Sequence, residues 1–283
     1  MPIGGVLTAM VTPFDDQGRV DEEAAVRVMR HLLDNGSDGL VLAGTTGEGA
    51  TLTDEEKVRL WELGVAEVGD EAYLVAGTGS NDTAHSVHLT ERATEVGVDA
   101  HLVVCPYYNK PNRRGLLAHY RAVAAATDLP VIVYNIPSRC VVDMDNELLR
   151  ELGQIEHVDA VKQARYEHLE PIDGLDLLAG NDDTLAKVMD IGGTGGILVS
   201  SHVIGREMRR MIDEPDARHE IHETYADLFR AMFITSSPTP VKAALNMIGV
   251  GVGGLRLPMV EASEEEKAAI RDVLTRHGIL AAV

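Results

Sequence analysis

Apolar residues along the chain alternate between two patterns. Short apolar runs are typical of buried strands, and each is followed by a longer segment with apolar residues at helical spacing. The predicted strands are residues 6–11, 39–43, 73–76, 100–105, 131–134, 158–162, 176–179 and 196–200. The helices predicted to follow them are residues 21–34, 53–68, 82–96, 115–126, 146–152, 167–172, 185–191 and 203–212.

This alternation predicts an α/β fold with a parallel sheet and crossover helices. Eight βα units favour a closed (β/α)8 TIM barrel over an open sheet. The alternation stops near Asp216, and three more helices follow, at residues 217–233, 239–248 and 263–277. We therefore expect a barrel of residues 1–215 and a C-terminal three-helix extension of residues 216–283.

Length, charge and cysteine content narrow the class of protein. A chain of 283 residues suits one barrel, since such folds reach about 250 residues as one domain. The net charge of −20 argues against nucleic acid and anionic membranes as partners. The two cysteines, Cys105 and Cys140, form neither a disulfide framework nor a metal-binding pair. With no leader pattern and no long apolar run, we expect a cytoplasmic protein.

Lys162 ends an apolar strand face. Side chains alternate along a strand, so Val158, Ala160 and Lys162 share one side. In one interpretation the lysine extends to solvent at the strand end. In the other it stays buried with a lowered pKa, which lets its amine attack a carbonyl and form a Schiff base.

The position of the strands decides between these interpretations, because working residues of such barrels gather at the C-terminal strand ends. Those ends offer Thr12, Thr45, Thr46, Tyr107, Tyr108, Tyr134, Arg139, Lys162, Gly180 and Ile197. Hydroxyls and loop amides can hold a carboxylate, and an arginine can hold a second one. This set predicts carbonyl chemistry on an anionic small molecule through Lys162. A protonated imine is itself an electron sink, so we expect no cofactor and no metal.

The motifs at these strand ends carry a resemblance to a known family. They read Leu7-Thr8-Ala9-Met10-Val11-Thr12-Pro13-Phe14, Gly44-Thr45-Thr46-Gly47-Glu48, Cys105-Pro106-Tyr107-Tyr108-Asn109-Lys110-Pro111, Tyr134-Asn135-Ile136-Pro137-Ser138-Arg139, Val161-Lys162, Ala179-Gly180-Asn181-Asp182 and Leu255-Arg256-Leu257-Pro258. Together they resemble the dihydrodipicolinate synthases, which belong to the N-acetylneuraminate lyase superfamily of pyruvate-dependent class I aldolases. The resemblance covers essentially the whole chain.

The resemblance implies a reaction and a site. Pyruvate would condense with L-aspartate 4-semialdehyde to 4-hydroxy-tetrahydrodipicolinate, on the route to diaminopimelate and lysine. The implied catalytic residues are Lys162 as the imine-forming amine and Thr46, Tyr134 and Tyr108 as a proton relay, with Tyr108 reaching into a neighbouring subunit. The implied substrate-binding residues are Thr45 and Thr46 for the pyruvate carboxylate, Arg139 for the aldehyde's carboxylate, and the backbone carbonyls of Gly180 and Ile197. The family usually forms homotetramers.

Two departures from the family pattern leave alternatives open. Gln163-Ala164-Arg165 replaces an acidic residue, alanine and a small hydroxyl residue after the lysine. This keeps open a retro-aldolase or dehydratase that acts on a sugar acid. Asp54, Lys57 and His85 stand where lysine-inhibited members have other residues, which argues against lysine feedback. A barrel that has lost catalysis and only binds a ligand or a partner is the alternative from another class.

Other polar patterns have simpler structural interpretations. The Thr45-Thr46-Gly47-Glu48 sequence can also be an ordinary turn before a capped helix. The pairs His85/His88 and His219/His222 have helical spacing that could bind a metal, but no third ligand lies near in sequence. We expect these histidines to lie on exposed helix faces.

Overall fold

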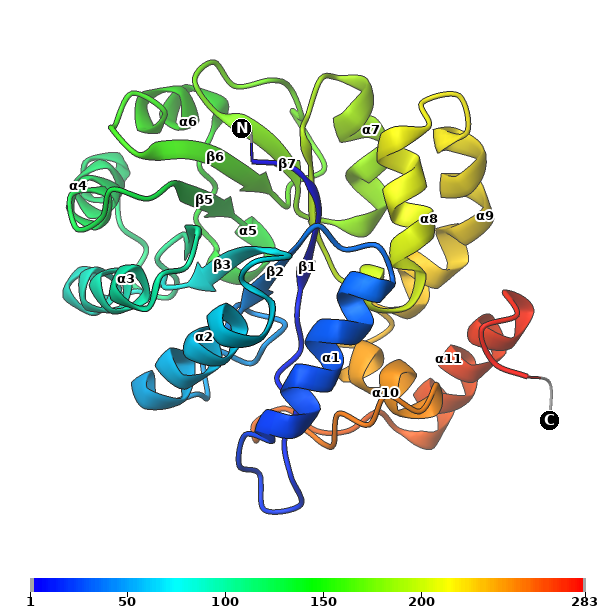
Figure 1. Cartoon of the computed structure of the whole chain (residues 1–283). Helices are drawn as coiled ribbons and strands as arrows, with labels where there is room; N and C mark the ends of the chain where they lie inside the picture. The colour runs from blue at the N-terminus through cyan, green and yellow to red at the C-terminus, as the bar shows by residue number, and fades with distance from the viewer. Residues whose placement is uncertain (1–2, 282–283) are drawn as a thin grey trace.

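The computed structural model describes residues 3–281 and contains a closed barrel of parallel strands. Neighbouring strands follow chain order, and β1 pairs with β8 to close the barrel. Figure 1 shows the strands at the centre with helices around them. The strands are β1 (Gly5–Ala9), β2 (Gly39–Leu42), β3 (Tyr73–Gly77), β4 (Ala100–Val104), β5 (Val131–Asn135), β6 (Val158–Gln163), β7 (Asp176–Ala179) and β8 (Gly195–Leu198). The predicted TIM barrel is confirmed.

Helices follow the strands and cover the outside of the barrel. The barrel helices are α1 (Glu22–Asp34), α2 (Asp54–Val68), α3 (Thr83–Val96), α4 (Arg113–Ala124), α5 (Pro137–Cys140), α6 (Asn146–Leu152), the 3-10 helix η1 (Asp182–Thr184), α7 (Leu185–Asp190) and α8 (Ser201–Asp213). The C-terminal helices are α9 (Arg218–Ala231), α10 (Thr239–Met247) and α11 (Glu264–Arg276).

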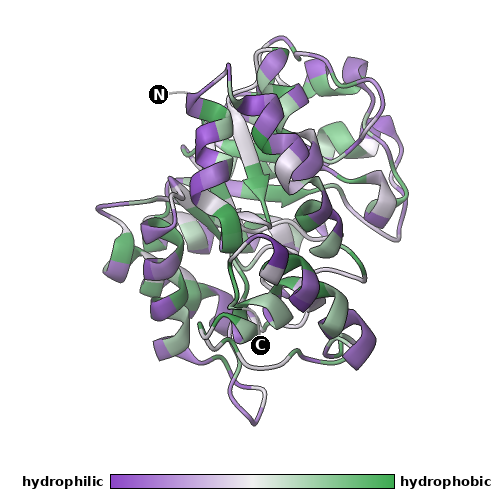
Figure 2. Ribbon diagram, turned by 90° about the vertical axis from the view of Figure 1, so that its right-hand side faces the viewer, coloured by the Kyte–Doolittle hydropathy of each residue, from purple (hydrophilic) through white to green (hydrophobic). Residues whose placement is uncertain are grey.

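The core lies between the strands and the inner helix faces. Every residue of β2, β5 and β8 is buried, as expected for parallel strands covered on both faces. Figure 2 shows hydrophobic residues gathered on the central strands, whereas the surrounding helices carry both hydrophobic and hydrophilic residues. The continuous apolar runs in the sequence therefore come from burial on both faces of the sheet.

Local side-chain hydrogen bonds begin the helices where the sequence predicts. The Asp21 carboxylate accepts the backbone N–H of Ala24 at 2.9 Å at the start of α1. Capping boxes begin α2 at Thr53 and α11 at Ser263. Each satisfies backbone donors that the first helical turn leaves unpaired.

One predicted helix was wrong. Residues 167–172 form no helix; the segment is irregular and contains an isolated antiparallel bridge between Ile172 and Leu175. Pro171 disfavours helical geometry in the residue before it. The carbonyl of His168 instead accepts hydrogen bonds from Asn146 and Arg165. The short helix α5, in contrast, was not predicted.

The C-terminal helices pack onto the barrel and onto each other. α9 contacts α8 and α11, and α11 also contacts α10. Arg218 at the start of α9 lies 2.6 Å from Asp190 of the barrel. The expected C-terminal helical extension is confirmed as part of the fold. Its proposed boundary after residue 215 falls between α8, which ends at Asp213, and α9.

Candidate active site

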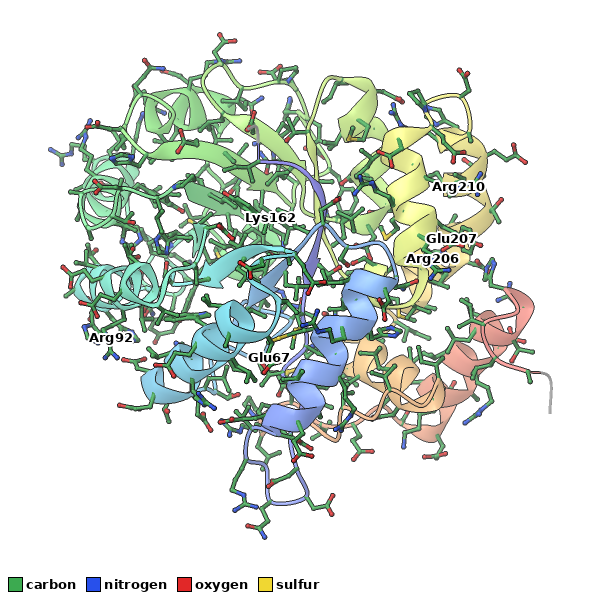
Figure 3. The ribbon with its side chains drawn as sticks, in the orientation of Figure 1. Glu67, Arg92, Lys162, Arg206, Glu207 and Arg210 are labelled. Carbon is green, nitrogen blue, oxygen red and sulfur yellow. The ribbon has the colours of Figure 1, made fainter. Side chains whose placement is uncertain are left out.

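Lys162 lies inside the barrel, near the C-terminal end of β6. It pairs in register with Tyr134 on β5 and with Leu178 on β7. Its ammonium nitrogen lies 4.1 Å from the centroid of the Tyr134 ring. Only 4% of the residue is exposed, and Figure 3 places it among the central strands. Lys162 therefore does not extend to solvent.

Burial determines the charge state of Lys162. Loss of hydration lowers the pKa of its amine from 10.5 to about 7; Asp182 opposes this shift, and the positive charge of Arg139 adds to it. A neutral amine is nucleophilic, whereas an ammonium is not. A large share of the Lys162 amine is therefore neutral at physiological pH.

Tyr134 brings a phenol beside the amine. Burial raises its pKa above the ordinary value, while the charge of Arg139 and a hydrogen bond with the Thr45 side chain act in the opposite direction. The threonine whose side chain lowers the pKa of Tyr134 is thus Thr45. The relay role expected for Thr46, which is itself buried, stays a prediction. Sequence reasoning assigned Thr45 to substrate binding alone.

The loop with both threonines is a closed turn. The backbone N–H of Glu48 donates to the carbonyl of Thr45 at 3.1 Å. The hydroxyl of Thr12 donates to the carbonyl of Gly47 at 2.6 Å. Gly49 is required here, because a Cβ atom at this position would collide with the carbonyl of Ala43. These contacts hold Thr45 and Thr46 directly after β2.

Arg139 supplies positive charge at the same end of the barrel. It lies on α5, which follows β5 directly, and its guanidinium donates to the carbonyl of Ser237 at 3.3 Å. Its charge lowers the pKa values of both Lys162 and Tyr134. Arg139, Tyr134 and Lys162 therefore form one electrostatic group.

Tyr108 is exposed to solvent, unlike the buried Lys162 and Tyr134. It follows β4, and 88% of it is exposed. Its backbone has a positive φ of 73°, a conformation uncommon for a residue with a side chain. The neighbouring Asn109 side chain donates to the carbonyl of Asn81 at 2.7 Å, which fixes the loop. The side chain of Tyr108 thus extends outward from its own barrel.

Gly180 and Ile197 lie on the strands that follow Lys162. Gly180 comes directly after β7, and its N–H donates to the carbonyl of Gln163 at 2.9 Å. A Cβ atom on Gly180 would lie 2.7 Å from the backbone nitrogen of Ala164, so the close approach requires glycine. Ile197 is fully buried in β8 and pairs with Leu7.

The departures after Lys162 lie outside this group. The Gln163 side chain accepts a hydrogen bond from Asn135 at 2.9 Å. The Arg165 guanidinium binds Asp143 at 2.9 Å and Asn146 at 2.8 Å. The positive charge of Arg165 is thus paired with the segment before α6, where it balances a carboxylate.

Asp182 is a buried carboxylate that sequence reasoning did not single out. Its oxygens accept the backbone N–H groups of Val199 and Ser200 at 2.8 and 2.7 Å, and the Ser200 hydroxyl at 2.6 Å. Asp182 is 1% exposed, and its charge favours the protonated form of Lys162. The only feature of the sequence that pointed to Asp182 was its place in the Ala179-Gly180-Asn181-Asp182 motif after β7.

One histidine of each pair at helical spacing lies beside a carboxylate. His85 lies 2.9 Å from Asp54, and His219 lies 2.8 Å from Asp190. Lys57, which is largely buried, also faces Asp54 at 3.9 Å. Within residues 3–281, His, Cys, Asp and Glu side chains form no group of three or more that could hold a metal ion. No helix in this range is long and apolar enough to span a bilayer.

Known proteins resemble the chain over its whole length. A sequence profile described as the dihydrodipicolinate synthetase family matches residues 2–277. The 4-hydroxy-tetrahydrodipicolinate synthase of Moorella thermoacetica is 44% identical, covering 99% of this chain and 100% of that protein. The enzyme of the same name from Desulforudis audaxviator is 42% identical, covering 98% of each chain.

Solved structures agree with these relatives. The crystal structure of dihydrodipicolinate synthase from Bacillus anthracis matches with a TM-score of 0.93 and 40% identity, covering 97% of this chain and 98% of that one. The enzyme from Aquifex aeolicus matches with a TM-score of 0.93 and 37% identity, covering 98% and 99%.

The chain belongs to the dihydrodipicolinate synthetase family. The family expected from the sequence is thereby confirmed. Its relatives are named 4-hydroxy-tetrahydrodipicolinate synthase, and the expected class of activity, a lyase that acts on small molecules, is confirmed with them.

Proposed function

We propose that the chain condenses pyruvate with L-aspartate 4-semialdehyde through a Schiff base on Lys162. The observation that carries this proposal is the buried Lys162 amine, 4.1 Å from the Tyr134 ring, with a pKa lowered to about 7. Imine formation needs an amine that is neutral when it attacks and protonated afterwards. A pKa near the working pH satisfies both requirements.

The first half of the reaction forms a nucleophile from pyruvate. The Lys162 amine attacks the ketone, and loss of water gives a protonated imine. Loss of a methyl proton then gives an enamine. The electrons of the broken C–H bond form the new C=C bond, and the imine nitrogen accepts those of the C=N double bond. Tyr134 moves protons in these steps, and the Thr45 side chain, which lowers the pKa of Tyr134, connects it to the Thr45–Thr46 loop. That loop holds the pyruvate carboxylate with hydroxyls and amides.

The second half joins the aldehyde. The enamine carbon attacks the aldehyde carbon, and the resulting alkoxide takes a proton. The amino group of the second substrate then displaces Lys162 from the imine carbon, which frees the enzyme and closes the ring. In this proposal the backbone carbonyls of Gly180 and Ile197 bind near the imine, as the family resemblance implies. The product is 4-hydroxy-tetrahydrodipicolinate, a precursor of diaminopimelate and lysine.

Arg139 supports the choice of the second substrate. L-Aspartate 4-semialdehyde carries a carboxylate, and a guanidinium can bind it with two parallel hydrogen bonds. Arg139 lies close enough to shift the pKa values of Lys162 and Tyr134. Arg165 was the reason to consider a sugar acid, but its charge is paired with Asp143. The geometry therefore favours the aspartate aldehyde over the sugar-acid alternative.

The assembly belongs to the same proposal. Tyr108 is exposed in the single chain, which is what a relay residue supplied to a neighbouring subunit requires. We therefore propose a homotetramer in which Tyr108 of one chain completes the site of another. We further propose that residues 1–215 and 216–283 act as barrel and extension, and that the enzyme works in the cytoplasm without a cofactor.

A comparison of acceptors tests the proposed function. The purified protein is incubated with pyruvate and either L-aspartate 4-semialdehyde or aldehydes of sugar acids, and pyruvate consumption is measured. The proposal predicts a far higher kcat/KM with the aspartate aldehyde. Preferential turnover of a sugar-acid aldehyde would contradict it, and so would equal rates with both classes.

A further inference from the structure

A buried ion pair connects the Thr45–Thr46 loop to the C-terminal helices. Glu48 Oε1 lies 2.6 Å from Lys242 Nζ, and their side chains are only 2% and 1% exposed. Removing two charges from water is costly, and their attraction often does no more than offset that cost. Such a pair is a weak source of stability, but it fixes the relative position of the groups that it joins.

The C-terminal region binds both carboxylate oxygens of Glu48. Lys242, on α10, faces Oε1, and the backbone N–H of Arg256 donates to Oε2 at 3.0 Å. The Lys242 ammonium also donates to the carbonyl of Gly254 at 2.7 Å and lies 4.2 Å from the centroid of the Phe14 ring. The Glu48 side chain is thus held from several directions.

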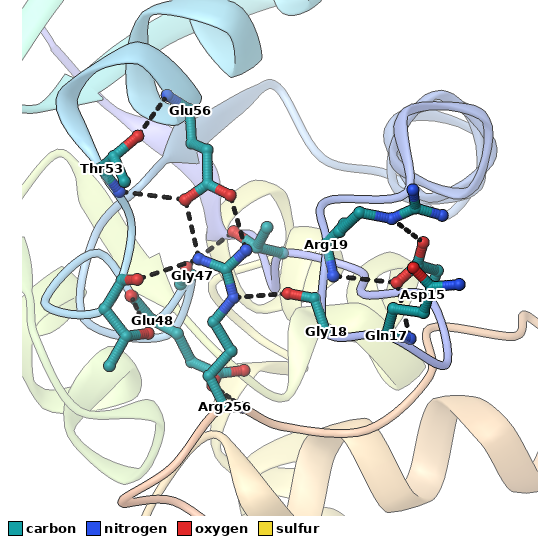
Figure 4. A network of polar contacts seen from close by, with 11 residues as sticks. Asp15, Gln17, Gly18, Arg19, Gly47, Glu48, Thr53, Glu56 and Arg256 are labelled. Atoms are coloured by element: carbon teal, nitrogen blue, oxygen red, sulfur yellow. Dashed lines mark hydrogen bonds and ion pairs between the residues drawn. The ribbon is translucent and has the colours of Figure 1, made fainter.

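Arg256 extends this network to the start of α2. Its guanidinium donates to both oxygens of Glu56, at 2.7 and 2.6 Å, and to the carbonyls of Thr51 and Gly18. Figure 4 shows Arg256 between Glu56 and Gly18, with Glu48 beside it. The segment after the threonines is therefore bound to the C-terminal region at Glu48, at Thr51 and at Glu56.

A displacement of Glu48 would be transmitted to the threonines. The Glu48 N–H donates to the carbonyl of Thr45 at 3.1 Å, and the residue has a positive φ of 53°. A non-glycine residue keeps such a conformation only when its surroundings hold it there. Lys242 and Arg256 supply those surroundings.

The same C-terminal region also contacts Arg139. The carbonyl of Ser237, just before α10, accepts a hydrogen bond from the Arg139 guanidinium at 3.3 Å. Residues 237–256 thus contact both groups expected to bind carboxylates, the Thr45–Thr46 loop through Glu48 and the guanidinium through Ser237.

We infer that Lys242 is a positioning residue, which acts through Glu48 to hold the Thr45–Thr46 loop in the conformation that binds the pyruvate carboxylate. This inference rests on the proposed function, because it assigns that loop to pyruvate. A displacement of even about 1 Å in a binding group can lower activity up to a hundredfold. Loss of the ion pair therefore affects pyruvate binding before it affects the barrel.

The test compares Lys242→Met with the wild-type enzyme and with Lys267→Met. Lys267 is in the same C-terminal region, but its ion pairs with Glu261 and Glu264 lie at the surface. We expect Lys242→Met to raise KM for pyruvate by about tenfold or more and Lys267→Met to leave it unchanged. Trapping with borohydride at saturating pyruvate counts the competent sites in each protein. We expect that count to be the same in all three.

A purely structural role gives a different result. It would reduce the count of competent sites and leave KM for pyruvate at the wild-type value, which would overturn the inference. If Lys242→Met does not fold, Glu48→Gln removes the charge at nearly constant shape, and a wild-type KM for pyruvate in that variant would likewise overturn it. Absence of an adduct in the wild-type enzyme would instead refute the proposed function.

Discussion

At the scale of single residues, the chemistry depends on what surrounds Lys162. Its neighbours are a phenol, a guanidinium and a buried carboxylate, contributed by Tyr134, Arg139 and Asp182. Burial and Arg139 favour the neutral amine, and Asp182 favours the protonated form. This balance leaves the amine able to gain and lose a proton near neutral pH.

The pH dependence of kcat/KM for pyruvate follows from this balance. Only the neutral amine attacks, so kcat/KM should fall about tenfold per pH unit below the pKa of Lys162 in the free enzyme. That break is expected at about pH 7, measured from initial rates across a pH series. A profile that rises without a break up to the ordinary lysine value of 10.5 would contradict the assignment.

The same pKa shift has a consequence for stability. Between about 7 and the unfolded value of 10.5, the unfolded chain binds a proton on Lys162 that the folded chain lacks, so this group makes folding more favourable as pH rises. Below this window, folding must bury an ammonium. Lys162→Met should therefore unfold at a temperature no lower than the wild type at about pH 6, as measured by thermal melts. A clear drop in melting temperature would contradict the claim that burial of the charged Lys162 amine opposes folding at this pH.

Two arginines near the site should behave differently. Arg139→Met should raise KM for L-aspartate 4-semialdehyde by about a hundredfold, because a charge-assisted pair with its carboxylate is lost. Arg165→Met also removes a guanidinium, but this one is already paired with Asp143. KM for the aldehyde should therefore change little in that variant. Steady-state kinetics with varied aldehyde measure both. A large effect of Arg165 alone would favour a different acceptor.

At the scale of elements, strand ends and the loops after them build the site. β5 and β6 pair directly. The Thr45 side chain, which follows β2, lowers the pKa of Tyr134 on β5, although β2 is far from β5 in sequence. The strands fix the amine and the phenol, and the loop supplies the hydroxyl. A small shift of this loop would therefore change the chemistry without changing the barrel.

The two loop threonines can be distinguished by isosteric variants. Thr45→Val removes the hydroxyl that lowers the pKa of Tyr134 and should lower kcat by about a hundredfold, a magnitude common for lost proton transfer. Thr46→Val should mainly raise KM for pyruvate. Initial rates at varied pyruvate separate the two effects. The reverse pattern, with kcat lost in Thr46→Val, would return the relay to Thr46.

The elements show what a sequence pattern can and cannot predict. Periodicity located all eight strands because burial on both faces produces continuous apolar runs. It also placed Lys162, since alternation along β6 is a local property. It gave the wrong structure for residues 167–172, where one hydrogen bond to the His168 carbonyl comes from Asn146, which lies outside the local pattern. For the same reason the Glu48–Lys242 pair, which spans most of the chain, left no recognisable pattern.

At the scale of the whole molecule, we propose that the site is shared between chains. The barrel alone brings together Lys162, Tyr134 and Thr45, whereas Tyr108 extends into solvent. The C-terminal region adds contacts through Lys242 on α10 and Ser237 just before it. In this account, folding assembles most of the site and association of subunits completes it.

Mixed oligomers test the sharing of Tyr108. Tyr108→Phe and Lys162→Ala should each have very low activity alone. When the two variants are mixed and reassembled, a site with wild-type Lys162 can receive wild-type Tyr108 from its neighbour, so activity should return. The readout is the specific activity of the mixture against each variant alone. Activity that stays at the level of the separate variants would place Tyr108 outside the neighbouring site.

The most direct test of the central claim is covalent trapping of the imine. The full-length protein is incubated with pyruvate and borohydride, digested, and analysed by mass spectrometry to locate the reduced adduct. The account predicts a single adduct on Lys162, and none on this residue's peptide in Lys162→Ala. An adduct on a different lysine, or no adduct with the wild-type protein, would contradict the proposed mechanism.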